Sequence, residues 1–255
     1  MEKQTTPTQA PQHANSAVQE AITGYLDAKR VQQASVEKME LIVEDIRRCQ
    51  QQKQDTETQG IEADNLWRDT FRQLRGKVSP EMKQQQMQRM ADRELAQELA
   101  GLLEELDIEK DQQVLYCTGS GTTLLQSHSN AAMIYAHHEF QRVLSQGLHE
   151  LVRAVKLKHE ALQMEQAVIT HHGRFSEYEK NPDDIIAKEI MAHLKTAISS
   201  YSFDMSQEPV LSQIGLNSPE VEYFNPKMST PAGRSMAFAN IREKKEKLKL
   251  RGKQE

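Results

Sequence analysis

The most regular pattern of apolar and polar positions lies between Thr123 and Gly173, a stretch with no proline and one internal glycine, Gly147. Apolar side chains recur there at alternating steps of four and three residues, which is the spacing of a helix packed lengthwise on another helix. This candidate dimer or packing seam consists of Leu148, Val152, Val155, His159, Leu162, Gln166 and Ile169. A second apolar stripe in the first half consists of Met133, Phe140, Leu144, Leu151 and Ala154. The pattern predicts one helix, about 75 Å long if ideal, that is covered from two sides and capped by Gly173.

The N-terminal third shows a weaker coiled-coil pattern. Met1–Asn15 is polar and predicts a disordered tail, with a helix beginning near Ser16 or Ala17. Heptad spacing follows at Ile22, Tyr25, Val36, Met39, Val43 and Ile46, with Lys29 and Gln32 as polar interruptions of the seam. The polar stretch Arg47–Gln59 fits a solvated helix or a mobile turn, and Gly60 is a candidate break. A further helical face carries Ile61, Trp67, Phe71 and Leu74, where Trp67 is expected to anchor two helices.

Caps and prolines place the remaining helices. Ser79 and Pro80 predict the start of a helix that runs to Leu106. The stretches Asp107–Gln113 and Thr118–Thr123 are expected to connect it to the long helix, with Thr122 or Thr123 as the next cap. The apolar stripe of this helix is Met82, Met90, Leu95, Leu99, Leu102, Leu103 and Leu106.

The C-terminal part carries three further start or stop signals. Asn181-Pro182 followed by two acids predicts a helix that ends near Ser199, after a connection in which Phe175 and Tyr178 are packing points. Its apolar face is Ile185, Ile186, Ile190, Met191, Leu194 and Ile198. Pro209–Ile214 predicts a short helical turn closed by Gly215, and Thr230-Pro231 opens a last helix.

These elements and the composition predict an all-α protein, an elongated bundle of long coiled-coil-like helices that forms an intertwined homodimer. Aromatic residues are 5% and hydrophobic residues 37% of the chain, too little for one large globular core but sufficient for helices that each bury one stripe. We divide the chain into a tail (1–15), a helical body (16–200) and a C-terminal loop with a basic helix (201–255). No run of 18 apolar residues predicts a membrane span, and the polar start shows no secretion signal.

Candidate chemistry is sparse. Thr118-Gly-Ser-Gly-Thr-Thr123 lacks the lysine and the preceding strand of a phosphate-binding loop, so a turn with a helix cap is expected. No pair of the nine histidines has the His-Glu-x-x-His spacing of a zinc site, and Cys49 and Cys117 are expected to be reduced thiols. No catalytic arrangement emerges, so we expect a protein that is not an enzyme and uses no cofactor or metal. If seam histidines such as His138 and His159 lie at a dimer contact, acid pH is expected to loosen it.

The last residues are basic although the whole chain has a formal net charge of −5. Arg242–Glu255 contains seven basic and three acidic residues, which fits either a grip on an acidic protein surface or a solvated helix end. Given the net charge, direct nucleic-acid binding is not expected.

Three ordered motifs in the last fifty residues resemble the phage polarity suppression (Psu) family. They are Val210-Leu-Ser-Gln-Ile-Gly215, Pro219-Glu-Val221, and Thr230-Pro-Ala232 followed by Met236 and Phe238. Specific matches cover about a fifth of the chain. This chain departs from the family pattern by one extra residue between Gly215 and Pro219 and another between Ala232 and Met236, and an extra residue rotates later side chains by about 100° on a helix.

The resemblance implies an all-helical, intertwined homodimer that binds the transcription terminator Rho and also decorates a phage capsid from outside. It places the protein in the bacterial host cytoplasm and on the capsid exterior. By position, the partner-binding candidates are Thr230, Pro231, Arg234, Met236, Phe238, Arg242, Lys244 and Lys245. The alternatives are a capsid decoration or external scaffolding protein without Rho activity, which would contact the major capsid protein, and a cytosolic coiled-coil adaptor.

Overall fold

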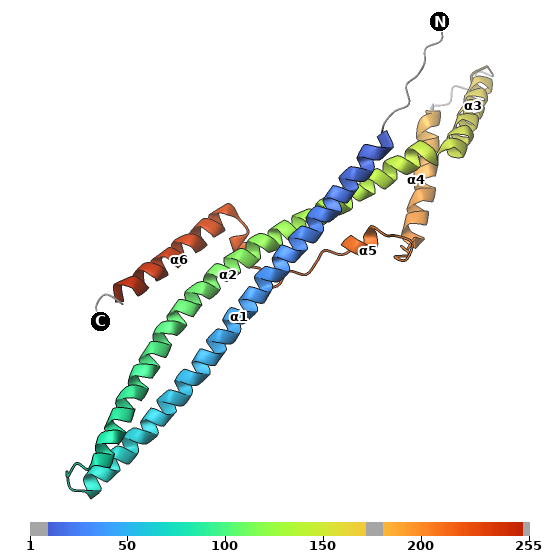
Figure 1. Ribbon diagram of the computed structural model, residues 1–255. Coiled ribbons are helices and arrows are strands. Elements are labelled where there is room, and N and C mark those ends of the chain that lie inside the picture. Colours follow the sequence, from blue (N-terminus) through green and yellow to red (C-terminus); the bar gives the residue numbers. More distant parts are fainter. Residues whose placement is uncertain (1–9, 172–180, 252–255) are drawn as a thin grey trace. The chain divides into compact units, whose positions relative to one another are not determined.

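The computed structural model describes the backbone of residues 10–171 and 181–251, which is entirely α-helices, one 3₁₀ helix and loops (Figure 1). The helices are α1 (Ala10–Gln73), α2 (Pro80–Gln146), α3 (His149–His171), α4 (Pro182–Ser200), α5 (Leu211–Ile214), the 3₁₀ helix η1 (Pro226–Met228) and α6 (Pro231–Arg251). The predicted all-α class is confirmed. The expected cap at Gly173 and the packing points Phe175 and Tyr178 lie outside the described residues, as does the side chain of Ile169.

The chain forms two compact units that are not continuous in sequence. Unit 1 comprises Met1–Gly24 and His128–Ser218, and unit 2 comprises Tyr25–Ser127 and Pro219–Glu255. The prediction had divided the chain in sequence order. Each unit instead combines a part of the long helices with a part of the C-terminal half of the chain.

Unit 2 is built on a hairpin of α1 and α2, whose seam follows the predicted heptad spacing. The buried positions of α1 in this unit are Tyr25, Ala28, Gln32, Met39, Ile42, Cys49 and Thr56. Two predicted seam positions are corrected by one residue, because Ile42 is buried while Val43 is 37% exposed, and Ala28 rather than Lys29 is buried. The regular seam keeps α1 helical through the polar stretch before Gly60 and through Gly60 itself, where a break had been considered.

The turn of this hairpin follows its predicted signals. Arg75 and Gly76 adopt positive φ angles of 50° and 83°, and glycine favours that region of the backbone map. Ser79 Oγ accepts a hydrogen bond from the Met82 N–H at 3.3 Å, so the predicted cap is confirmed. Beside the turn, the Arg89 guanidinium of α2 lies over the Trp67 ring of α1, with Arg89 Cζ 4.9 Å from the ring centroid, as expected of an anchor between helices.

The stretch Thr118–Thr123 was expected to be a turn, and that prediction is wrong. It lies inside α2, which is continuous for 67 residues through the predicted connection. The hydroxyls of Thr118 and Thr122 donate to carbonyl oxygens one turn earlier, at 2.7 and 2.8 Å, and so remain compatible with the helix.

The same small and polar residues receive a returning segment of unit 2, residues 219–225. Thr118 Oγ1 accepts a hydrogen bond from the Asn225 N–H at 3.1 Å. A side chain in place of the hydrogen at Gly121 would meet the Phe224 ring at 3.1 Å, so the glycine permits close packing. The buried Gln32 accepts a hydrogen bond from Ser120 at 2.5 Å and donates one to the Glu222 carbonyl at 3.4 Å. Gln32, the polar residue that interrupts the apolar seam of α1, therefore has hydrogen-bond partners in α2 and in this segment.

Unit 1 contains the break that corrects the predicted long helix. α2 ends at Gln146 and α3 begins at His149, so the stretch from Thr123 is divided at Gly147. α3 packs against α4, whose cap is confirmed because Asn181 Oδ1 accepts from the Asp183 N–H at 3.1 Å. The short α5 and its Gly215 closure are also confirmed, with a φ of 78° at Gly215. Two contacts join the α5 region to α2 within this unit: His128 Nε2 lies 3.3 Å from the Gly215 carbonyl oxygen, and Tyr135 donates to Glu208 at 2.9 Å.

Candidate interaction surfaces

The last helix begins at a closely packed corner. Thr230 Oγ1 accepts a hydrogen bond from the Gly233 N–H at 3.1 Å, and Pro231 occupies the first helical position, as predicted. A Cβ atom at Gly233 would lie 1.7 Å from the Lys227 carbonyl oxygen of η1. Only glycine therefore fits here. Thr230 and Pro231, predicted as partner-binding residues, serve to start the helix.

α6 is held on α2 by a small apolar core. Ala237 and Ile241 of α6 are buried with Ile108 and Leu115 of α2, and Ile241 is only 6% exposed. Met228 and Leu248 pack at the edges of this core. The core fixes which face of α6 turns inward and which faces remain available.

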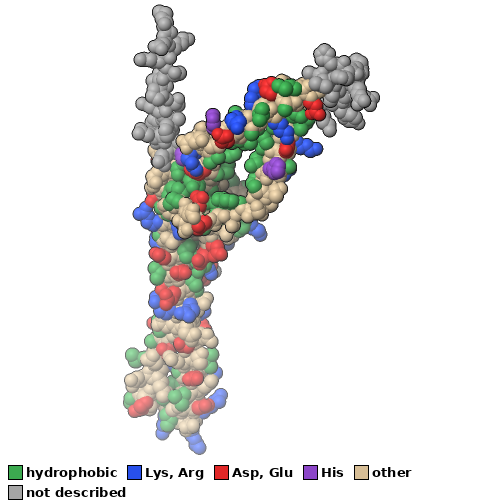
Figure 2. Space-filling model, turned by 90° about the vertical axis from the view of Figure 1, so that its right-hand side faces the viewer, with side chains coloured by type: hydrophobic (Ala, Val, Ile, Leu, Met, Phe, Trp, Pro, Cys, Tyr) green, Lys and Arg blue, Asp and Glu red, His purple; other side chains and the backbone are tan. Residues whose placement is uncertain are grey.

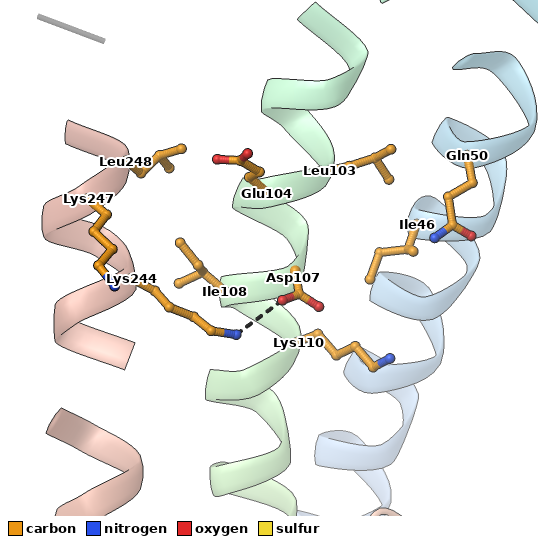
Figure 3. Close-up of a pocket in the computed structure, with 10 residues that line it drawn as sticks. All are labelled: Ile46, Gln50, Leu103, Glu104, Asp107, Ile108, Lys110, Lys244, Lys247 and Leu248. Atoms are coloured by element: carbon orange, nitrogen blue, oxygen red, sulfur yellow. Dashed lines mark hydrogen bonds and ion pairs between the residues drawn. The ribbon is translucent and has the colours of Figure 1, made fainter. Parts of the chain in front are cut away.

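Lys244 adds an ionic clamp between the same two helices. Its Nζ lies 2.6 Å from Asp111 Oδ2 and 3.2 Å from Asp107 Oδ2, and Figure 3 shows the side chain reaching from α6 toward α2. The hydrogen bond to Asp111 is the main cause that raises the pKa of Lys244 above its ordinary value. Lys244 is thus engaged within unit 2, which separates it from the other predicted partner-binding cations.

A hollow of about 510 Å³ lies beside this clamp. Apolar side chains from three helices line it: Ile46 of α1, Leu103 and Ile108 of α2, and Leu248 of α6 (Figure 3). Lysines and acids alternate around it, so the hollow has no dominant charge. It offers a shallow apolar contact rather than a site for a strongly charged ligand.

The exposed flank of α6 next to the buried Ile241 carries the remaining predicted residues. At about 100° per residue, Arg234, Phe238, Arg242 and Lys245 fall within an arc of about 80°, and Lys249, which the prediction omitted, lies in the same arc. Phe238 is 55% exposed. Met236, also predicted, is 74% exposed but points about 160° away from Phe238. We call Arg234, Phe238, Arg242, Lys245 and Lys249 the cationic stripe.

The hairpin of α3 and α4 in unit 1 presents a second surface, an apolar groove of about 360 Å³. It is lined by Leu151, Ala154 and Val155 of α3 and by Ile186, Ile190 and Leu194 of α4, and Lys158 forms an ion pair with Glu189 across it. Figure 2 shows hydrophobic side chains exposed along the two helices.

The predicted seam is therefore partly a contact between α3 and α4 of one chain. Val155, Leu162 and Leu148 are half-buried, whereas Val152 is 59% exposed and lies outside this contact. His159 Nε2 lies 3.4 Å from Asp183 Oδ1. The expected loosening at acid pH concerned a dimer contact and stays a prediction. Homodimer formation stays a prediction.

Two further searches bear on chemistry and location. Across residues 16–166 and 181–250, no three His, Cys, Asp or Glu side chains gather in a way that could hold a metal ion. Of the helices in the described part of the chain, none is long and apolar enough to cross a membrane.

Comparisons with known proteins point to a satellite phage. No protein-family model matches the chain. It is 29% identical over 216 residues to Glycoprotein 3 of Enterobacteria phage P4, covering 84% of this chain and 86% of that protein. Among solved structures, a chain of the satellite phage P4 procapsid including size determination (Sid) protein shares the fold, with a TM-score of 0.73 at 24% identity over 96% of this chain and 100% of that one.

These findings confirm the phage relationship but leave the Psu family itself unconfirmed. The resemblance to Psu and the contact with Rho stay predictions. The chain is homologous to a protein of satellite phage P4 and shares its fold with a component of that phage's procapsid.

Proposed function

We propose that this protein binds a phage procapsid and helps to determine the size of the shell, acting by binding and without chemistry of its own. Two similarities support the proposal. The chain is similar to Glycoprotein 3 of phage P4 over 84% of its length, and it shares its fold with a chain from the P4 procapsid structure that includes the size determination (Sid) protein. The external scaffolding alternative thus takes precedence over Rho inhibition. The bacterial host and the procapsid surface are the corresponding locations.

The hairpin of unit 2 is suited to bridging neighbouring capsid subunits. Its seam is closed by heptad packing and by the hydrogen bonds of the buried Gln32, which resist sliding of the two helices. The outer faces expose large apolar side chains, several of them more than half accessible: Leu41, Ile61, Leu66, Met87 and Met90. These side chains supply apolar area on the hairpin that a neighbouring protein could cover.

Co-expression with the major capsid protein of the phage P4 procapsid tests the proposal. Particles would be purified by sedimentation and their diameters measured by electron microscopy, with and without this protein. We expect the protein to co-sediment at a fixed ratio and the diameter distribution to shift. Unchanged shells that lack the protein, although it is folded and soluble, would overturn the proposal.

A Rho-dependent terminator reporter separates the two phage activities. The scaffolding proposal expects no change in read-through when this protein is expressed. Read-through together with unchanged shells would instead support the Psu-like prediction.

A further inference from the structure

We propose that the cationic stripe of α6 is the surface through which this protein docks on a carboxylate-rich patch of the capsid protein. The inference deepens the proposed function and rests on it for the identity of the partner. Its argument comes from the arrangement of charge on one helix.

The stripe is continuous and rigidly presented. From Arg234 to Lys249 it extends about 22 Å along the helix. The inner face of α6 is fixed by the buried Ile241, by the Lys244 clamp and by the Thr230 cap. Side chains on this exposed flank therefore reach a partner without first having to order the backbone, which lowers the entropic cost of binding.

The cations of the stripe have no acidic counterparts. In the part of the chain that the structure describes, Arg242, Lys245 and Lys249 form no ion pair, and Arg234 contacts only the Ser229 carbonyl, at 3.4 Å. Within α6, Glu243 pairs with Lys247 at 2.7 Å, and Glu246 lies about 40° beyond Arg242, outside the arc of the stripe. Four cations within one arc and no acid among them are expected to attract a surface of opposite charge.

Phe238 provides an apolar anchor within the same arc. It lies between Arg234 and Arg242, one turn from each, and its ring is 55% exposed. An exposed aromatic ring flanked by arginines resembles the residues that dominate binding energy in protein interfaces. A purely solvated helix end would have no need of this ring.

The surroundings favour a protein partner over nucleic acid. A duplex carries its charge along its whole length and would extend beyond the stripe. The neighbouring segment of α2, residues 104–111, carries five acids (Glu104, Glu105, Asp107, Glu109 and Asp111) and one lysine. The formal net charge of −5 adds further repulsion, so a short acidic patch fits better than a polyanion.

A charge-neutralised pair of full-length variants tests the inference. The stripe variant is R234Q/R242Q/K245Q/K249Q. The control is K29Q/R47Q/K188Q/K195Q, which removes four exposed cations that form no ion pair with any described residue and lie away from the exposed apolar side chains of the hairpin. Binding to preassembled capsid shells would be measured by co-sedimentation at low and physiological salt, after circular dichroism has shown equal helicity and melting.

We expect the stripe variant to bind about thirtyfold more weakly, with a reduced salt dependence, and the control to change less than about threefold. F238A should weaken binding about tenfold with little change in salt dependence. Equal losses in both charge variants, or no loss in either, would overturn the inference.

A second probe separates failure of the stripe from failure of the proposed function. Retention on immobilised poly-glutamate and on duplex DNA would be compared for the same variants. If wild-type protein ignores shells but is held by poly-glutamate through the stripe, the surface assignment stands and the capsid proposal falls. Stripe-dependent binding to DNA that exceeds binding to shells or poly-glutamate would overturn the assignment.

Discussion

The small core between α2 and α6 should be selectively weakened by Ile241→Ala. Ile241 is 6% exposed and packs with Ala237, Ile108 and Leu115. Substitutions of buried isoleucine by alanine cost about 2–5 kcal/mol through lost apolar burial and the cavity left behind. Because this core is bordered by only partly buried side chains, its neighbours can partly relax, and we expect about 2–3 kcal/mol. That corresponds to an increase of about 30- to 150-fold in the opening equilibrium of α6.

Native-state hydrogen exchange with mass spectrometry measures this opening for each segment. Amides of α6 should lose protection by the stated factor, while the α1–α2 hairpin near the turn keeps its own. Met236→Ala is the matched control, because Met236 is 74% exposed on the same helix and its loss should leave protection unchanged. Equal protection of α6 in wild type and Ile241→Ala, or a uniform loss over the whole chain, would refute the idea that this core docks the helix on α2.

Three further predictions concern polar contacts. Lys244→Met should destabilise α6 by less than about 1 kcal/mol near neutral pH, since the ion pair with Asp111 is partly exposed. The raised pKa of Lys244 means that its stabilisation is present below about pH 10.4 and is lost as pH rises through the folded-state pKa, so hydrogen exchange of wild type and variant should converge there. Burial and a carboxylate partner raise the pKa of Tyr135 to about 12, so Tyr135→Phe should remove the late phase of the phenolate absorbance titration, and an unchanged curve would contradict that environment. Thr118→Val should cost about 1–3 kcal/mol in chemical denaturation, because the Asn225 N–H loses its acceptor, and the same exchange at an exposed threonine should be nearly neutral.

Local signals were sufficient to place most helix ends. Ser79, Asn181 and Thr230 each form the predicted capping hydrogen bond. These predictions succeeded because a cap depends on two or three neighbouring residues and on fixed backbone geometry. The seam of α1 was found because heptad spacing is also local, with errors of one residue at Lys29 and Val43, whose neighbours Ala28 and Ile42 are buried instead.

The stretch Thr118–Thr123 shows where local signals fail. Its glycines and hydroxyl residues have the composition of a loop. In the structure they form a recess in α2 for Phe224 and for the N–H of Asn225, more than a hundred residues away in the chain. Only that distant segment explains why small residues are needed inside a helix.

The proposed cationic stripe overlaps in part with the partner-binding residues predicted from the sequence. The sequence identified α6 and the residues Arg234, Phe238, Arg242 and Lys245. It could not separate them from Lys244, because that distinction depends on Asp107 and Asp111 of α2. Lys249 was missed, although helical spacing from Lys245 was the signal that would have included it.

The sequence by itself therefore determined the all-α class, most helix starts and the heptad seam of α1, because each depends on interactions between residues a few positions apart. The tertiary structure decided that α2 continues to Gln146, that two units share the long helices, and which side chains of α6 remain free. Those outcomes depend on contacts between segments that only folding brings together, and such contacts leave no periodic trace in the chain.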